Sequence, residues 1–324
     1  MERLVVISGA AGMTGSETVR RLLKKGYKVI GFDNFFASSI DTIKDVLEHP
    51  DFTFFEFDIN CTGQMIVLET LLGEKHGELH FINCAAVVHT KYFYIPQATF
   101  ETNVISMKNF LEMAIRLGAK TYINCSTSEV YSFGSYKEGG VLENDLLLFS
   151  TAENSLRTSY ATGKLLTEFF MKEAVENGLI KGCSIRFANV YSDSELYPEH
   201  IIPYTIYSLL NGDNVQLLEN ARKTYRTFLH NYDSCDAVIS LLETPEALDG
   251  SVYNAGTTEE ILIPDLVQTI ADKMGKKVTI TYKGERTADP LRRLLNIEKI
   301  RTRTGWSPKV TLDEGLSLCL EKIV

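Results

Sequence analysis

Short apolar runs alternate with helix-like stretches through the first half of the chain, and this alternation limits the possible fold more than any other feature. The runs predict buried strands at Leu4–Ser8, Lys28–Phe32, Phe52–Phe57, Leu79–Cys84 and Thr121–Cys125. Between these runs, the apolar spacing predicts helices at Gly15–Lys25, Met65–Leu72 and Thr99–Leu117. Alternating strands and helices indicate βαβ units, whose right-handed crossovers build a parallel sheet covered on both faces. We therefore predict an α/β fold with a doubly wound parallel sheet.

The second half of the chain is less regular. Past residue 186, prolines occur at positions 198, 203, 245, 264, 290 and 308, and charged loops separate the apolar runs. No internal repeat or low-complexity tract stands out in the sequence. We therefore expect a main domain over residues 1–186, with a return segment near 225–256, and a smaller C-terminal lobe that takes up most of residues 187–324.

A glycine-rich segment joins the first predicted strand to the first predicted helix. Gly9, Gly12 and Gly15 are three residues apart in it. The first glycine permits a tight turn, the second lets the backbone approach a pyrophosphate, and the third lets helix and strand pack closely. The N-terminus of the helix then presents unpaired N–H groups and a partial positive charge to the phosphates. The segment, which includes Met13 and Thr14, therefore predicts a dinucleotide-binding site.

The second predicted strand runs into an acidic residue that favours NAD over NADP. Asp33, followed by Asn34, can accept hydrogen bonds from the hydroxyl groups of a ribose. Its carboxylate would also repel a 2′-phosphate, and no arginine follows directly. Asp58 and Ile59, which follow the third strand, are candidates to contact the adenine.

Tyr160 and Lys164 are four residues apart, so on a helix their side chains share one face. The ordinary pKa of tyrosine, about 10, makes it a poor base at neutral pH. A neighbouring ammonium group, together with the positive nicotinamide ring of oxidised NAD, favours the phenolate and is expected to lower the pKa of Tyr160. A hydroxyl-rich segment, Asn124–Tyr131, follows the fifth strand at the sheet edge where open parallel sheets bind ligands.

In this order along the chain, the motifs resemble those of the extended short-chain dehydrogenases/reductases that act on nucleotide sugars, a group of epimerases, 4,6-dehydratases and decarboxylases. The resemblance covers nearly the whole chain. It is carried by Gly9-x-x-Gly12-x-x-Gly15, Asp33-Asn34, Ala85-Ala86, Asn103, Ser126–Tyr131, Tyr160-x-x-x-Lys164, Arg186–Tyr191, Arg226 and Gly305–Pro308. It implies a Rossmann sheet that binds NAD in the main domain, and a C-terminal lobe that binds the nucleotide-sugar substrate.

The resemblance also implies roles for single residues. Tyr160 takes the proton of a sugar hydroxyl, Lys164 binds the nicotinamide ribose, and Thr127 supplies the catalytic hydroxyl, with Ser128 beside it. The cofactor positions of the family include Ala85, Ala86 and Asn103. The positions that hold the nucleotide diphosphate or the sugar correspond to Asn189, Arg226 and Arg293. Arginine suits this task because it stays charged and binds phosphate in a bidentate way.

Enzymes of this group first move a hydride from a sugar carbon, usually C4, to NAD, and they differ in the later steps of the reaction. The Thr-Ser-Glu sequence at residues 127–129 is similar to GDP-mannose 4,6-dehydratases and UDP-glucuronate decarboxylases. In a dehydratase, Glu129 would be a second base that takes the C5 proton. We therefore expect C4 oxidation as the first step of dehydration or epimerisation.

Some segments depart from these subfamilies. Residues 132–136 lack the usual glycine after Val-Tyr, Tyr191 is followed by Ser-Asp, and residues 133–159 do not match decarboxylases. These departures permit a C4 dehydrogenase that releases a 4-keto sugar. The similarity of the Thr-Ser-Glu sequence keeps a UDP-glucuronate-type decarboxylase as a further alternative. A non-catalytic redox sensor that binds the dinucleotide is an alternative from another class, although it would not need Thr127, Tyr160 and Lys164 together.

Overall composition argues against several other functions. The 33 basic and 42 acidic residues give a net charge of -9, which disfavours non-specific nucleic-acid binding. None of the six cysteines forms a C-x-x-C pair, so we expect reduced thiols in the cytosol and no metal site. No signal-peptide pattern or membrane-length apolar run is present. Helix Thr99–Leu117 and the helix of Tyr160 carry apolar residues on more than one face, which with the family resemblance suggests a homodimer.

Overall fold

The computed structural model describes residues 3–75, 77–133, 137–195, 197–287 and 289–323. At its centre is a seven-stranded sheet in the order β10-β6-β5-β4-β1-β2-β3, and all its neighbouring strands are parallel. Its strands are β1 (Arg3–Ser8), β2 (Lys28–Asp33), β3 (Phe52–Glu56), β4 (Glu78–Asn83), β5 (Thr121–Thr127), β6 (Lys181–Phe187) and β10 (Asp249–Ala255). The predicted doubly wound parallel sheet is confirmed.

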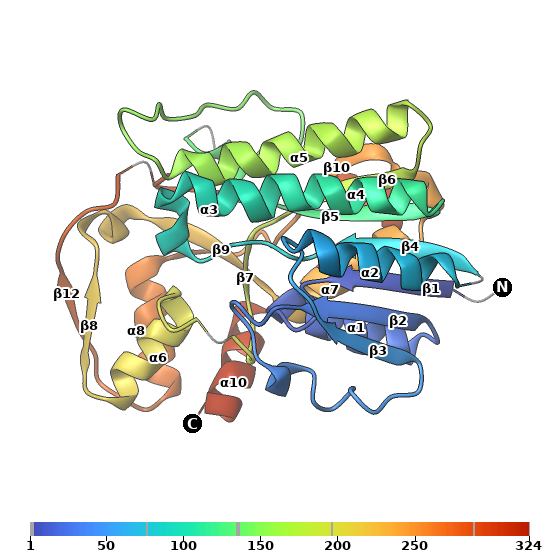
Figure 1. Ribbon diagram of the computed structural model, residues 1–324. Helices are drawn as coiled ribbons and strands as arrows, with labels where there is room; N and C mark the ends of the chain where they lie inside the picture. The colour runs from blue at the N-terminus through green and yellow to red at the C-terminus, as the bar shows by residue number, and fades with distance from the viewer. Residues whose placement is uncertain (1–2, 76, 134–136, 196, 288, 324) are drawn as a thin grey trace.

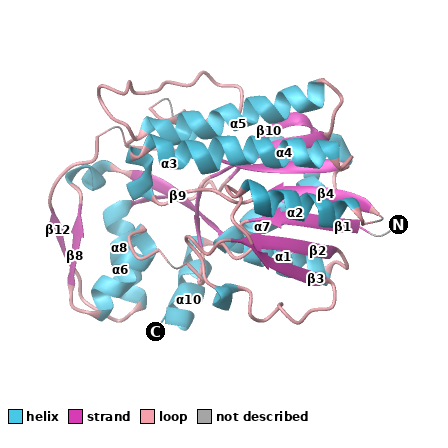
Figure 2. Ribbon diagram, in the orientation of Figure 1, coloured by secondary structure: helices cyan, strands magenta, loops and turns pink. Residues whose placement is uncertain are grey.

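Helices cover both faces of this sheet, as Figures 1 and 2 show. Alternate residues of a strand point to opposite faces, so a strand buried on both sides is apolar at every position. In β1, Val5 and Ile7 pack in the same core as α1 (Met13–Lys24) and α7 (Asn231–Leu242). Leu4 and Val6 pack on the other face, whose covering helices are α2 (Thr62–Gly73), α4 (Met107–Arg116) and α5 (Thr158–Glu176).

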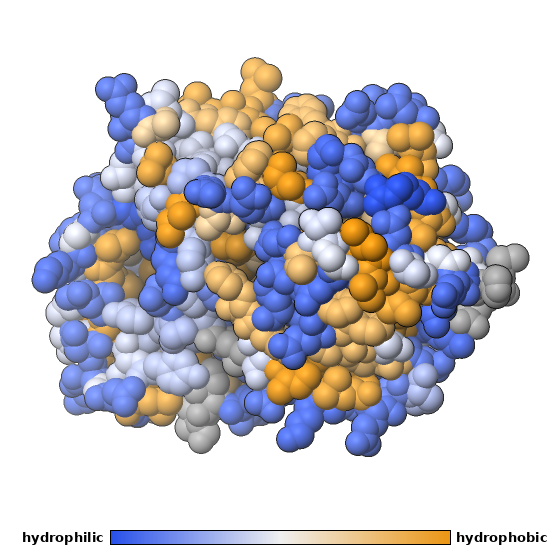
Figure 3. Space-filling model, in the orientation of Figure 1, coloured by the Kyte–Doolittle hydropathy of each residue, from blue (hydrophilic) through white to orange (hydrophobic). Residues whose placement is uncertain are grey.

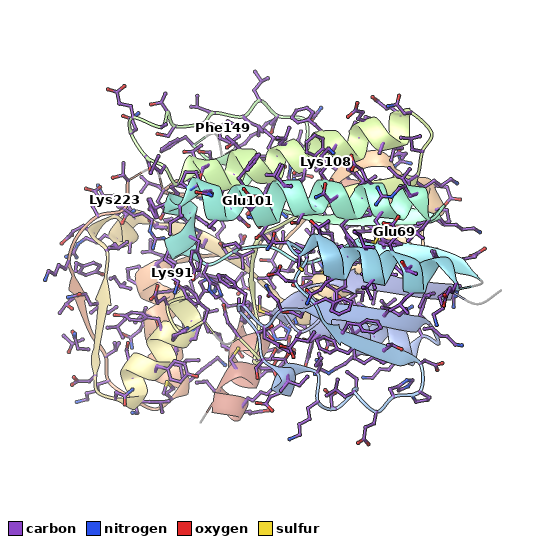
Figure 4. All side chains as sticks on the ribbon, viewed as in Figure 1. Glu69, Lys91, Glu101, Lys108, Phe149 and Lys223 are labelled. Carbon is purple, nitrogen blue, oxygen red and sulfur yellow. The ribbon has the colours of Figure 1, made fainter. Side chains whose placement is uncertain are left out.

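The helical stretch expected at Thr99–Leu117 has a more complex structure than its sequence indicates. It begins with α3 (Pro96–Phe100), continues through a π-helical segment, η3 (Glu101–Ser106), and ends with α4. Arg116 of α4 pairs with Glu69 of α2 at 2.7 Å, and Figure 4 labels Glu69 on the near side of the molecule. No residue type in the sequence marks the wider turn of η3.

The apolar residues on the two adjacent helices α4 and α5 differ in exposure. Phe110, Leu111 and Met113 of α4 are all buried within the chain. On α5, Leu166 is 40% exposed and Phe169 is 62% exposed. Figure 3 shows apolar surface along the upper edge of the molecule, over α5 and the segment that precedes it. The apolar side chains of α4 are therefore used inside the chain, whereas α5 leaves some of its own uncovered.

The C-terminal lobe has a core of its own and lies beyond the carboxyl ends of the main strands (Figure 2). Its strands are β7 (Asn189–Tyr191), β9 (Tyr225–His230) and β11 (Glu260–Leu262) in one sheet, and β8 (Asn214–Leu217) and β12 (Thr279–Tyr282) in another. Its helices include α6 (Ile201–Leu210), α8 (Ile263–Lys273) and α10 (Leu312–Ile323), while α9 (Glu298–Thr304) contacts β10 of the main sheet.

The chain crosses between the main sheet and the lobe several times. After β7 it forms most of the lobe, but α7 packs on α1 and β10 joins the edge of the main sheet. On the main-sheet side, η2 (Thr90–Tyr94) places the ammonium of Lys91 5.9 Å from the ring centre of Tyr197. Figure 4 shows Lys91 at this boundary and Lys223 in the lobe. Within the described ranges, no helix is long and apolar enough to cross a membrane.

Candidate active site

A cavity of about 940 Å³ is lined by residues from both the main sheet and the lobe. It opens at the carboxyl ends of β1, β2, β4 and β5, where parallel sheets bind ligands. The predicted residues that line it are Gly9, Gly12, Met13, Thr14, Gly15, Asp33, Asn34, Asp58, Ile59, Ala85, Ala86, Thr127, Ser128, Glu129, Tyr160, Lys164, Asn189 and Arg226. The other two predicted residues, Asn103 and Arg293, are not among its lining residues.

The glycine-rich turn between β1 and α1 leaves no space for side chains. Gly9 has φ +70°, and a Cβ there would lie 2.8 Å from the backbone nitrogen of Ala85. A Cβ on Gly15 would lie 2.0 Å from the carbonyl oxygen of Gly9. The turn brings the N-terminus of α1 to the cavity wall with Gly12 as its N-cap. This backbone cradle fits the pyrophosphate of a dinucleotide.

The carboxylate of Asp33 is held in place at the end of β2. One oxygen accepts a hydrogen bond from the backbone N–H of Ala11 at 3.1 Å. The other accepts from the N–H of Phe35 and the hydroxyl of Ser38, both at 2.9 Å. Because Asp33 lines the cavity, its carboxylate fits the ribose hydroxyls of NAD and opposes a 2′-phosphate.

The side chain of Asn103 is occupied by backbone contacts. It lies buried in the π-helical segment η3, accepts from the N–H of Val87 at 2.7 Å and donates to the carbonyl of Val87 at 3.1 Å. These two bonds fix the loop after β4, which carries Ala85 and Ala86 at the cavity wall. Asn103 therefore does not face the cavity itself but holds in place the loop that forms its cofactor side.

Tyr160 and Lys164 share one face of α5, as their spacing predicts. Lys164 is only 2% exposed, and its ammonium group donates to the carbonyl oxygen of Cys125 at the end of β5. Burial lowers the pKa of Lys164, and the negative potential of Cys125 and Glu168 opposes this effect. The lysine thus ties the helix that carries Tyr160 to the strand that carries Thr127.

The pKa of Tyr160 lies above its ordinary value, in contrast to the lowering expected from the sequence. Burial is the largest cause, the negative charge of Glu129 adds to it, and a hydrogen bond with Thr127 acts in the opposite direction. The ammonium of Lys164 is engaged with Cys125 and is not among the groups that shift Tyr160. In the protein alone, desolvation of the phenolate therefore outweighs the opposing positive charge of Arg157.

Glu129 is clamped between two buried arginines. Its carboxylate accepts from Nη1 of Arg293 at 2.7 Å and from Nη2 of Arg157 at 3.1 Å. Burial alone would raise the pKa of Glu129, but Arg293 and Arg157 outweigh it and hold the pKa well below the usual range. Arg293 contacts Glu129 but does not line the cavity. Glu129 is therefore a fixed anion with little basicity.

The lobe contributes a second carboxylate–arginine contact beside this cluster. Asp289 Oδ1 lies 3.1 Å from Nη2 of Arg226 and 3.6 Å from Nη2 of Arg157. Burial lowers the pKa of Arg226 to about 10, and Asp289 opposes this shift. Asn189, at the start of β7, donates to the carbonyl of Thr227 at 2.9 Å and also lines the cavity.

Several residues of this site were not predicted from the sequence, and three of them contact the predicted groups. Arg157 lies three positions before Tyr160, and that spacing could have placed both on one side of the same helix. Phe93, which stacks on Tyr160, and Asp289 come from distant segments without a recognisable motif. Contacts between segments so far apart in sequence follow only from the folded backbone.

The described residues contain no group of three or more histidine, cysteine or acidic side chains that could hold a metal ion. Cys84, directly after β4, and Cys125 of β5 both line the cavity with their sulfur atoms 3.7 Å apart, and both are free thiols. Hydroxyl, phenol, thiol, imidazole, carboxylate, ammonium and guanidinium groups line the cavity. Such a set fits proton transfer and anion binding next to a dinucleotide.

Comparison with known proteins gives consistent matches along the chain. The model of the NAD dependent epimerase/dehydratase family matches residues 5–256. UDP-glucuronic acid decarboxylase 5 of Arabidopsis thaliana is 28% identical over 330 residues, covering 98% of this chain and 88% of that protein. UDP-glucuronic acid decarboxylase 1 of Danio rerio is 26% identical, covering 98% and 72% of the two chains.

Solved structures show the same fold over nearly the full length. A dTDP-glucose 4,6-dehydratase from Bacillus anthracis, solved with NAD, is 26% identical with a TM-score of 0.83, covering 99% of this chain and 96% of that one. A UDP-glucuronic acid 4-epimerase from Bacillus cereus has a TM-score of 0.86 at 24% identity, covering 99% and 98%, and its likeness concerns the fold alone.

Proposed function

The chain belongs to the NAD dependent epimerase/dehydratase family, and from that premise we propose that it oxidises a nucleotide-linked uronic acid at C4 and then decarboxylates it. The matched relatives named as UDP-glucuronic acid decarboxylases support this substrate class. The sequence-based expectation named dehydration or epimerisation first and decarboxylation as an alternative. The pairing of Glu129 with two arginines is the observation that favours decarboxylation.

The first step uses residues at the junction of β5 and α5. Tyr160 takes the proton of the C4 hydroxyl, Thr127 orients that hydroxyl, and Lys164 binds the nicotinamide ribose. NAD, when bound, accepts the hydride from C4 and later returns it. The glycine turn would hold the pyrophosphate of NAD, and Asp33 would hold the hydroxyls of its adenosine ribose.

The second step distinguishes the reaction types. Dehydration needs a base for the C5 proton, and the pairing of Glu129 with Arg157 and Arg293 makes that carboxylate a poor one. A C4 ketone turns a uronic acid into a β-keto acid, which needs no such base. The C5–C6 bond breaks, its electron pair moves to the ketone oxygen as CO2 leaves, and C5 then takes a proton.

Of these two arginines, Arg157 lines the cavity and would bind the substrate carboxylate. Nη1 of Arg157 and both Nε and Nη2 of Arg293 are buried without a hydrogen-bond partner among the described residues. Buried donors without partners cost free energy, and a charged acceptor would satisfy them. Arg157 also lines the cavity, and a guanidinium group there suits a sugar carboxylate.

One observation favours a second candidate, 4,6-dehydration. Glu129 lines the cavity within the Thr-Ser-Glu sequence, so a substrate that displaces Arg293 from it would restore a base there. This candidate predicts a 4-keto-6-deoxy sugar as product. A C4 dehydrogenase would instead release a 4-keto sugar together with free NADH, and a redox sensor would convert no nucleotide sugar at all.

The decisive experiment supplies UDP-glucuronic acid labelled in its carboxyl group. We expect labelled CO2 and a product whose mass is lower by that loss. Tyr160→Phe should release CO2 at least about a hundredfold more slowly, the lower range for general acid–base catalysis, while it still binds NAD. A product of unchanged mass would indicate epimerisation, and one that has lost water would indicate dehydration; either result would reject the proposed second step.

We further propose that residues 1–186, with the return segment 225–256, bind NAD and that residues 187–324 mainly bind the nucleotide sugar. Support comes from the placement of the glycine turn and Asp33 in the first part and of Asn189 and Arg226 at the cavity wall. Arg226 falls within the return segment, so one side chain there faces the substrate side. A homodimer and a cytosolic location stay predictions.

A further inference from the structure

The ring of Phe93 lies flat against the ring of Tyr160. Their centroids are 3.9 Å apart and their planes differ by 9°. Phe93 belongs to η2, the short turn after β4, and both side chains line the cavity. Phe93 is 5% exposed and Tyr160 is 4% exposed, so each ring covers a face of the other that would otherwise meet water.

Two neighbours of Tyr160 hold Phe93 in this position. The guanidinium carbon of Arg157 lies 5.1 Å from the centroid of the Phe93 ring. The hydroxyl of Ser159 donates to the carbonyl of Phe93 at 3.2 Å. Aromatic pairs on their own prefer offset or edge-to-face arrangements. A centroid distance of 3.9 Å is shorter than such pairs usually have, so the contacts of Arg157 and Ser159 help to maintain the stack. These contacts also join η2 to the start of α5.

From this geometry we propose that Phe93 is a positioning residue that fixes the ring of Tyr160 and shields its hydroxyl from water. A base fixed by packing keeps its oxygen in line with the proton that it removes. The inference rests on the proposed role of Tyr160 as the base for C4 oxidation. It does not depend on whether decarboxylation, dehydration or epimerisation comes next.

The shielding has a predictable electrostatic direction. Burial is the largest cause of the raised pKa of Tyr160, and the ring of Phe93 is part of that burial. The face of an aromatic ring is also negative, which disfavours a phenolate beside it. Truncation of Phe93 should admit water, stabilise the phenolate and lower the pKa of Tyr160.

The test compares Phe93→Leu and Phe93→Ala with the wild type in single-turnover reduction of bound NAD by UDP-glucuronic acid, followed by NADH absorbance across pH. We expect the maximal rate to fall about tenfold to a hundredfold, since small misplacements of reacting groups have effects of this size. At the same time, the acid limb of the profile, where the rate rises as Tyr160 loses its proton, should move to lower pH by about one unit. The reason is that truncation removes part of the burial that raises the pKa of Tyr160.

Phe93→Tyr and Phe110→Leu serve as matched controls. Phe93→Tyr retains a flat ring and should restore most of the rate and the wild-type acid limb. Phe110→Leu truncates a fully buried ring in the core under the sheet, away from the cavity, and should leave the limb where it is. An acid limb that stays in place in both Phe93→Leu and Phe93→Ala would overturn the proposal, whatever the loss of rate.

A separate readout distinguishes this inference from the proposed function. If no nucleotide sugar reduces NAD bound to the wild-type protein, the proposed function fails. The ionisation of Tyr160 can still be followed by tyrosinate absorbance, as the difference between each protein and its Tyr160→Phe version. We expect Tyr160 to ionise at lower pH in Phe93→Ala than in the wild type, and an unchanged titration would overturn the inference.

Discussion

The half-buried Glu129 and the buried Arg157 and Arg293 form one cluster in which each charge affects the chemistry of its neighbours. The two arginines suppress the basicity of Glu129, and Glu129 in turn raises the pKa of Tyr160. Arg157 acts on Tyr160 in the opposite direction and also contacts Phe93. The behaviour of any one of these groups therefore depends on side chains that are far apart in the sequence.

The pairing of Glu129 leads to a prediction for Glu129→Gln. We expect this variant to form enzyme-bound NADH and to release a product with solvent deuterium at C5, because departure of CO2 opens that position without a base. Mass spectrometry of the product made in heavy water measures this. If NADH forms but neither CO2 nor C5 deuterium appears, Glu129 acts in the second step. Unchanged NAD affinity would show that the fold is intact.

Asp33 gives a prediction about cofactor choice. Its fixed carboxylate should make NAD bind more tightly than NADP, because it accepts from the ribose and repels a 2′-phosphate. Asp33→Ala should narrow the difference between the two affinities, measured by calorimetric titration. Asn34→Ala, at the neighbouring exposed position, is the control and should preserve the preference. Equal affinities in the wild-type protein would contradict the role given to Asp33.

At the scale of elements, a buried ion pair joins β5, α5 and β6 near Thr127 and Tyr160. Glu168 of α5 accepts from Nη2 of Arg186 of β6 at 2.7 Å and from the hydroxyl of Ser126 of β5 at 2.6 Å. Both charged side chains are only 4% exposed. The pair thus fixes the strand end that carries Thr127 relative to the helix that carries Tyr160.

Loss of one partner should destabilise this junction strongly. Glu168→Gln leaves the guanidinium of Arg186 buried without its counter-charge, and we expect the free energy of unfolding to fall by about 3–5 kcal/mol. Urea unfolding measures the change. The double variant Glu168→Gln with Arg186→Met should recover part of it, because neither charge then remains buried. Full additivity of the two single changes would argue against a coupled pair.

At the scale of the whole molecule, the cavity is lined from both parts because the lobe lies over the carboxyl ends of the main strands. The chain crosses between the two parts: α7 and β10 complete the main domain after the first part of the lobe, and α8, β12 and α10 of the lobe follow them. The opposite side of α5 carries Leu166 and Phe169, which stay exposed on one chain. An uncovered apolar strip on a helix of this length favours contact with a second copy.

We predict a dimer through α5. Light scattering at micromolar concentration should give the mass of two chains for the wild type. Phe169→Glu places a charge in the strip and should shift the protein to one chain without loss of folding. Leu210→Glu alters a half-exposed leucine of the lobe and should remain dimeric. A wild-type protein that is strictly monomeric would contradict the expected assembly.

The sequence by itself determined the fold class and the positions of the main motifs. Alternating apolar runs and helical spacing are local signals, since each strand or helix must bury its own apolar face. The glycine spacing and Asp33 likewise depend on a single strand–turn–helix unit. For this reason, the main elements of the first half could be predicted from the order of residues along the chain, and most of the predicted site residues line the cavity.

The tertiary structure alone decided the chemical state of those residues. The sequence led us to expect a lowered pKa for Tyr160 and a basic Glu129. In the folded protein, burial and the charge of Glu129 raise the pKa of Tyr160, whereas Arg293 and Arg157 lower the pKa of Glu129. Phe93 is brought to Tyr160 by the turn after β4, and Asp289 is brought to Arg226 by the lobe. Solvation and charge pairing depend on every group within a few ångströms, and only the folded chain determines which groups those are.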